Sequence, residues 1–166
     1  MTLIGIPIRG DGPDEGSVRW VLSRSQYALD AKITRSGGHS IRWSNDGGGP
    51  VLPAIRRVIK DDGKAMDVAG GKRYEVSAWV KTQDVTGDGV TVSLSCNGDM
   101  GFVDRTESKP LAGTNDWTLV KITPPPLFEF VYWCRVVLSA KPGSTGTAWF
   151  DRVNVVELDK GKLCVS

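Results

Sequence analysis

The feature that most constrains the fold is a strict two-residue alternation of apolar and polar side chains in the middle of the chain. It runs through residues 74–81 (YEVSAWVK) and again through residues 90–96 (VTVSLSC). A period of two places successive side chains on opposite faces of a β-strand, so both runs are predicted to be half-buried strands. Residues 86–89 between them (TGDG) are typical of a turn. We therefore predict a β-hairpin over residues 74–96.

Shorter strand-like runs occur elsewhere, separated by clusters of Gly, Asn, Asp and Pro. They cover residues 40–44, 116–122, 132–138 and 148–156, whereas residues 54–60 fit either a strand or a helical turn. The run at 116–122 stops before three prolines, which have no N–H group to donate to a ladder. Such runs predict an all-β, antiparallel sandwich. The length, 166 residues, is that of one domain, which we place over residues 1–166.

Charge and hydropathy exclude two classes of partner. Lys and Arg total 21 and Asp and Glu total 19, so the net charge is only +2. This balance lacks the dense basic stripe of a nucleic-acid-binding protein. No apolar run approaches the roughly 18 residues of a membrane span, and residues 1–9 lack the pattern of a signal peptide. We expect no nucleic-acid partner and no membrane insertion. The sequence leaves open a cytosolic protein, a module of a longer secreted protein, or part of a virion.

The reactive side chains are few. His39 is the single histidine, which excludes a multi-histidine metal site, and its Gly-rich turn is typical of a surface residue. Cys96, Cys134 and Cys164 form no Cys-x-x-Cys pair, so zinc and thioredoxin-like sites are excluded. Cys96 and Cys134 could pair if their strands meet, but we expect free buried thiols.

Four segments form an ordered set of motifs: residues 36–41 (SGGHSI), 72–82 (KRYEVSAWVKT), 113–118 (GTNDWT) and 146–153 (GTAWFDRV). The set resembles the carbohydrate-binding modules of families 4, 9 and 22, and it places the core of the domain at about residues 14–158. The resemblance implies a galactose-binding-domain-like jelly roll. Three features depart from the family pattern, one of them that the closing motif has Asp151-Arg152 in place of two aspartates. Residues 13–16 lack the aromatic residue of its opening motif, and the stretch 47–71 is longer than usual.

The resemblance implies a non-catalytic module that binds a polysaccharide or oligosaccharide. Such a module would belong to a larger extracellular or surface protein, with an attached catalytic domain as a possible neighbour. Two alternatives stay open: a jelly-roll polysaccharide lyase or glycoside hydrolase, and a structural or protein-interaction sandwich of a virion or cell surface. Against catalysis, the chain has no G-x-S-x-G motif, and Glu75 is the one carboxylate expected on a concave face.

The resemblance also implies one structural calcium ion. It maps the ligands to Glu15, Asp151 and backbone carbonyls between Ser36 and His39, which are the oxygen donors that calcium prefers. The alternation of the last strand predicts an inward-facing Asp151, and a buried carboxylate is costly without a cation or several donors. We favour calcium. The alternative is that Asp151 accepts hydrogen bonds from backbone N–H groups at the rim of the sandwich.

Sugar sites need flat aromatic faces beside planar polar groups. Two predicted strands carry such residues on the face opposite their apolar side chains: Glu75, Trp79 and Lys81 on one, Trp133 and Arg135 on the other. If these strands are neighbours, the five side chains line one concave sugar-binding sheet. Alternatively, the N-terminal segment or the long stretch 47–71 covers this face, and both tryptophans belong to a second small core.

The remaining large aromatic residues have packing explanations. Trp43, Trp117 and Trp149 lie at positions where alternation and the family pattern both point inward, so we predict that they are core residues. Trp20 and Tyr27 lie in the loop-rich start of the chain. They form either a second sugar platform at the end of the sandwich or an anchor that holds this segment on the sheet.

Overall fold

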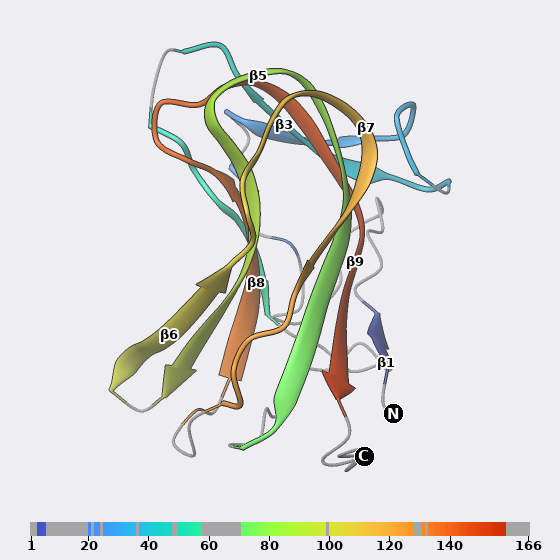
Figure 1. Cartoon of the computed structure of the whole chain (residues 1–166). Coiled ribbons are helices and arrows are strands. Elements are labelled where there is room, and N and C mark those ends of the chain that lie inside the picture. Colours follow the sequence, from blue (N-terminus) through green and yellow to red (C-terminus); the bar gives the residue numbers. More distant parts are fainter. Residues whose placement is uncertain are drawn as a thin grey trace, which may run out of the picture.

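Figure 1 shows the computed structural model of the protein. It describes residues 3–5, 20, 22–23, 25–35, 37–47, 50–57, 71–98, 100–127, 131 and 133–158. In these ranges every regular element is a strand, and no helix is long and apolar enough to cross a membrane. The strands are β1 (Leu3–Gly5), β2 (Tyr27–Asp30), β3 (Ser40–Asn45), β4 (Ala54–Arg57), β5 (Arg73–Gly98), β6 (Gly101–Glu107), β7 (Leu111–Ile122), β8 (Trp133–Ala140) and β9 (Thr145–Leu158).

Antiparallel ladders join these strands into one sheet of order β2-β3-β9-β5-β8-β4, with β1 paired to β9 and both β6 and β7 paired to β5. The sheet curls over into two layers (Figure 1). Layer A contains β1, β2, β3, β7, β9 and residues 73–82 of β5. Layer B contains β4, β6, β8 and residues 90–98 of β5. The predicted all-β antiparallel sandwich is confirmed.

The predicted hairpin over residues 74–96 is wrong. Both alternating runs lie on the single 26-residue strand β5, which crosses from one layer to the other. Its first part pairs with β7 and β9, and its last part pairs with β6 and β8. Between them the register shifts, and Gly87 and Gly89 have positive φ angles of 76° and 106°. The same Gly-rich chemistry that makes a tight turn can instead bend a strand at a bulge.

Gly89 holds this crossing in place. Its carbonyl oxygen accepts a hydrogen bond from the Lys141 amide at 2.8 Å, and its own amide donates to Ser144 Oγ at 3.1 Å. A Cβ atom on Gly89 would lie 2.5 Å from the carbonyl oxygen of Leu111, the first residue of β7. Only glycine therefore lets β5, β7 and the turn between β8 and β9 approach this closely.

The hydrophobic core lies between the two layers as one cluster. Ile41, Trp43 and Phe150 enter it from layer A, and Leu94 and Leu138 enter it from layer B. All five are almost completely buried, so the prediction that Trp43 is a core residue is confirmed.

A disulfide joins Cys96 of β5 to Cys134 of β8 inside this core. The two residues are direct cross-strand partners, with their Cα atoms 4.2 Å apart. The expectation of free thiols is therefore wrong. It followed from counting cysteines, whereas the register of two strands distant in the sequence decides whether two thiols meet.

A bulge in β9 reverses which residues face the core. Arg152 has a positive φ of 51°, and the register with β5 shifts at this point. Before the bulge Phe150 faces the core, and after it Val153 does, although their positions differ by three. Trp149 and Asp151 consequently lie on the outer face of layer A. Trp149 is buried, with 4% of its surface exposed, but the prediction that it belongs to the main core is wrong. The prediction that Asp151 faces that core is also wrong.

Candidate functional site

The predicted sugar-binding residues fall on opposite sides of the sandwich. Trp79 pairs with Leu119 of β7 and with Asp151 of β9, so its side chain shares the outer face of layer A with Glu75 and Lys81. Trp133 and Arg135 pair with residues 97 and 95 of β5 and lie on the outer face of layer B. Because the core separates the two faces, these residues do not form one concave surface.

A loop covers part of the outer face of layer A. The Arg35 amide donates to Asp151 Oδ2 at 2.7 Å, and the Arg35 guanidinium lies 4.3 Å from the centroid of the Trp79 ring. Below this loop, Trp149 Nε1–H donates to Asp30 Oδ2 at 3.0 Å. Trp79 therefore lies in a second small cluster on this face, whereas Trp133 lies on layer B, so the alternative holds for Trp79 alone. Among the described residues, the segment over Trp79 is 31–35, rather than the N-terminal segment or the stretch 47–71 that the sequence suggested.

Asp30 organises the start of this loop, a role that we did not anticipate. Its Oδ1 accepts hydrogen bonds from the amides of Lys32 and Ile33 at 2.8 and 3.1 Å, the pattern of an Asx turn. Burial would raise the pKa of this carboxyl, but donors around it have the larger combined effect. The Ile33 amide, the Trp149 indole, the Lys32 amide and the Arg42 guanidinium together hold the pKa below its usual value of 3.8.

Asp151 already has two donors. The Arg35 amide binds Oδ2 and the Arg152 amide binds Oδ1, each at 2.7 Å. This is the alternative raised from the sequence, a carboxylate bound by backbone N–H groups. Within the described part of the chain, no three His, Cys, Asp or Glu side chains converge as metal ligands. His39 is half-buried, whereas Glu15 and Ser36 lie outside the described residues. The calcium site stays a prediction.

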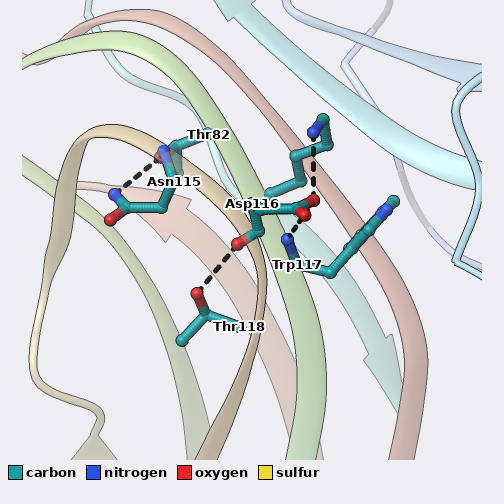
Figure 2. Close-up of polar contacts among 6 residues, drawn as sticks. Thr82, Asn115, Asp116, Trp117 and Thr118 are labelled. Atoms are coloured by element: carbon teal, nitrogen blue, oxygen red, sulfur yellow. Dashed lines mark hydrogen bonds and ion pairs between the residues drawn. The ribbon is translucent and has the colours of Figure 1, made fainter.

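Trp117 lies on the outer face of layer A and is half-buried, so the prediction that it belongs to the core is wrong. On β7, Val120 and Ile122, of opposite parity, contact the core. Figure 2 shows the polar contacts beside Trp117. Its amide donates to Asp116 Oδ1 at 2.8 Å, and Thr118 Oγ1 donates to the Asp116 carbonyl at 2.9 Å. The Trp117 amide, together with Lys81 Nζ at 3.2 Å, lowers the pKa of the Asp116 carboxyl.

Tyr27 and Trp20 anchor the N-terminal segment. Tyr27 is 4% exposed, and its hydroxyl lies 2.6 Å from the Leu52 carbonyl oxygen and 3.2 Å from that of Leu138. Burial raises the pKa of this hydroxyl. Trp20 is half-buried and packs against the core. A ring enclosed like that of Tyr27 offers no face to a sugar, which favours the anchoring alternative over a second platform.

The outer face of layer B contains a cleft of about 530 Å3. Thr91 and Ser95 of β5, both buried, and Val137 of β8 lie at its base. The segment 50–55, strand β6 and the turn at 141–143 border it. Hydroxyl groups both donate and accept hydrogen bonds, so this base can bind polar ligands.

Charged side chains border the cleft. Glu107 pairs with Lys141 Nζ and lies 3.6 Å from Arg105 Nη2. Arg135 projects from β8, with its guanidinium 5.7 Å from the centroid of the Trp133 ring. Its Nε is buried and has no hydrogen-bond partner among the described residues. Hydroxyls, charged groups and an adjacent indole are thus brought together on one open face.

The sequence indicated only part of this cleft. The outward positions of residues 90–96 were recognised as small and polar, and two of them, Thr91 and Ser95, lie at its base. Arg105, Glu107 and Lys141 were missed because β6 (GFVDRTE) has no clear period of two and residue 141 lies in a turn.

No family model matches the chain, and no curated protein sequence matches it. Among solved structures, a family 16 carbohydrate-binding module has a TM-score of 0.61 at 17% identity over 83% of this chain and 90% of its own. The CBM22-2 xylan-binding domain of Paenibacillus barcinonensis Xyn10C has a TM-score of 0.57 at 11% identity, over 87% of this chain and 94% of its own. The enzymatically active domain of bacteriophage CBA120 tailspike protein 4 has a TM-score of 0.62 at 11% identity, covering 80% of this chain.

At these identities the likeness establishes the fold. Modules of families 4, 22, 30 and 61 also occur among the similar structures, so the neighbours are mostly carbohydrate-binding modules. The jelly-roll β-sandwich is confirmed, and the neighbours agree with the resemblance found in the sequence. This chain spans only 18% of the tailspike domain.

Proposed function

We propose that this chain is a non-catalytic carbohydrate-binding module that binds a polysaccharide or oligosaccharide in the cleft of layer B. The observation that carries the proposal is the cleft itself, with Thr91 and Ser95 hydroxyls at its base and Trp133 on the same face. Sugars present ring hydroxyls to polar groups and C–H surfaces to aromatic rings. The volume, about 530 Å3, lies within the range typical of small-molecule sites.

The similar structures support this choice. One is a xylan-binding domain, and another holds a CBM22-1 module together with a GH10 module in one xylanase. By analogy, we propose that the chain works as part of a larger protein at a cell or virion surface. The Cys96–Cys134 disulfide favours an oxidising compartment.

A binding role is favoured over catalysis by the composition of the cleft. Glu107 is the one carboxylate among its described lining residues, and it is engaged by Lys141 and Arg105. Glycoside hydrolysis usually needs two carboxyl groups roughly 5 to 9.5 Å apart, one of them able to donate a proton. The enzyme alternative has support from the tailspike domain, which is described as enzymatically active.

A glycan array followed by a turnover assay on every hit tests the proposal. Trp133→Ala should lose most of the binding, whereas Trp79→Ala, on the opposite face, should retain it. Both variants should keep a cooperative thermal transition. Release of reducing ends or unsaturated products, lost in Glu107→Gln, would establish the enzyme instead. An array without hits would favour the protein-interaction alternative.

A structural calcium held by Asp151, Glu15 and the carbonyls of Ser36 and His39 is a second proposal, which rests on the resemblance. A cation that binds only the folded state raises the melting temperature by mass action. Calcium should therefore raise Tm, chelator should lower it, and Asp151→Ala should remove the difference. An identical Tm of the wild type in calcium and in chelator would refute the proposal.

A further inference from the structure

The charges around the cleft of layer B do not balance. Three cationic side chains line it, Arg105, Arg135 and Lys141, against one carboxylate, that of Glu107. Glu107 is shared, because Oε1 pairs with Lys141 and Oε2 with Arg105. Three cations minus one anion leave an excess of two positive charges among the described lining residues. A concave surface with low-dielectric walls focuses such a field on whatever enters it.

Arg135 is the cleft cation that does not pair with Glu107. It has no carboxylate partner among the described residues, and its Nε is buried without a hydrogen-bond partner there. Its register partner is Ser95 at the base of the cleft, and its guanidinium lies 5.7 Å from the centroid of the Trp133 ring. A buried donor without a partner costs free energy unless a ligand supplies the acceptor.

We infer that the cleft of layer B selects an acidic glycan, whose uronic-acid carboxylate pairs with Arg135. This inference rests on the proposed carbohydrate-binding function and adds the class of sugar. A guanidinium presents parallel N–H donors that match the two oxygens of a carboxylate, and such charge-assisted pairs are stronger than neutral hydrogen bonds. The Thr91 and Ser95 hydroxyls remain available for the neutral hydroxyls of the same sugar.

Calorimetric titration with matched polymers tests the inference. The probes are polygalacturonate, alginate and hyaluronan, each compared with its carboxyl-reduced form, which is neutral but has the same backbone. We expect at least one acidic polymer to bind about tenfold more tightly than its reduced form. Raising the salt concentration from about 50 to about 500 mM should weaken only the acidic one, because ions screen the pair.

Two variants separate a specific pair from diffuse attraction. Arg135→Gln should abolish the preference for the acidic form while leaving the weaker binding of the reduced form. Arg73→Gln removes an exposed cation from layer A and should leave the preference intact. Arg135→Lys keeps the positive charge but loses the parallel N–H donors of the guanidinium, so it should retain only part of the wild-type preference for the acidic form. Each variant is first checked for a wild-type Tm, and if Arg135→Gln fails to fold, Arg135→Lys carries the test.

Four outcomes would overturn the inference. Equal affinity for acidic and reduced forms would remove the acidic preference but leave the carbohydrate-binding function standing. Equal weakening by Arg73→Gln and Arg135→Gln would show diffuse attraction by the whole chain. Binding only to neutral glycans on the array would refute the sugar class alone, whereas failure to bind any glycan would refute the proposed function as well.

Discussion

Replacing Gly89 by alanine tests the crossing of β5 between the layers. The added Cβ would lie 2.5 Å from the Leu111 carbonyl oxygen, in a backbone conformation with φ of 106° that L-residues rarely adopt. The conformation costs about 1–3 kcal/mol and the overlap about 1–3 kcal/mol more. The strand cannot simply move away, because Gly89 is hydrogen-bonded to Lys141 and Ser144. We expect Gly89→Ala to lose about 3–5 kcal/mol of unfolding free energy.

The matched control is Gly143→Ala. Gly143 also has a positive φ, 81°, but nothing lies within 4 Å of its added Cβ, so only about 1–2 kcal/mol should be lost. Urea unfolding followed by tryptophan fluorescence measures both variants against the wild type, with the disulfide intact. In a chain of this size, the Gly89 variant should melt roughly 10 °C lower. Equal losses in the two variants would refute the close approach of β5 and β7.

Three further predictions concern burial, pH and the disulfide. Trp43→Ala should cost about 3–5 kcal/mol in urea unfolding, and half-buried Trp117→Ala only about 1 kcal/mol; the opposite order would contradict the assigned faces. The folded-state pKa of Asp30 lies below 3.8, so its stabilisation is present at neutral pH and is lost as pH falls through that folded-state pKa. The difference in unfolding free energy between wild type and Asp30→Ala should therefore become smaller in acid. A difference that does not change with pH would exclude stabilisation by the ionised Asp30 carboxylate. Reducing Cys96–Cys134, separated by 38 residues, should lower the unfolding free energy by about 2–4 kcal/mol, and an unchanged midpoint would refute the pairing.

The alternation in the sequence predicted which faces of β5 and β8 are buried, because a period of two directly reports the two sides of a strand. It could not predict how β5 continues after residue 82. The residues 86–89 favour a turn and a bulge alike, and the choice depends on contacts with Leu111 and Ser144 from other strands.

The candidate site was predicted less completely than the fold. Arg135 and Trp133 were recognised because they share the polar face of an alternating strand. Their separation from Trp79 follows from the crossing of β5, which local patterns do not reveal. The reversal of faces at Arg152 likewise escaped a strict period of two, and so Trp149 and Asp151 were assigned to the wrong side of layer A.

The most direct test of the cleft as the carbohydrate site is NMR titration of the isotopically labelled chain with the glycan that binds best on the array. The amides of Thr91, Ser95, Arg105 and Arg135 should shift progressively and saturate together, while those around Leu119 on the outer face of layer A stay unchanged. Shifts confined to the face that carries Leu119, or no shifts at saturating glycan, would contradict a binding site in the cleft of layer B.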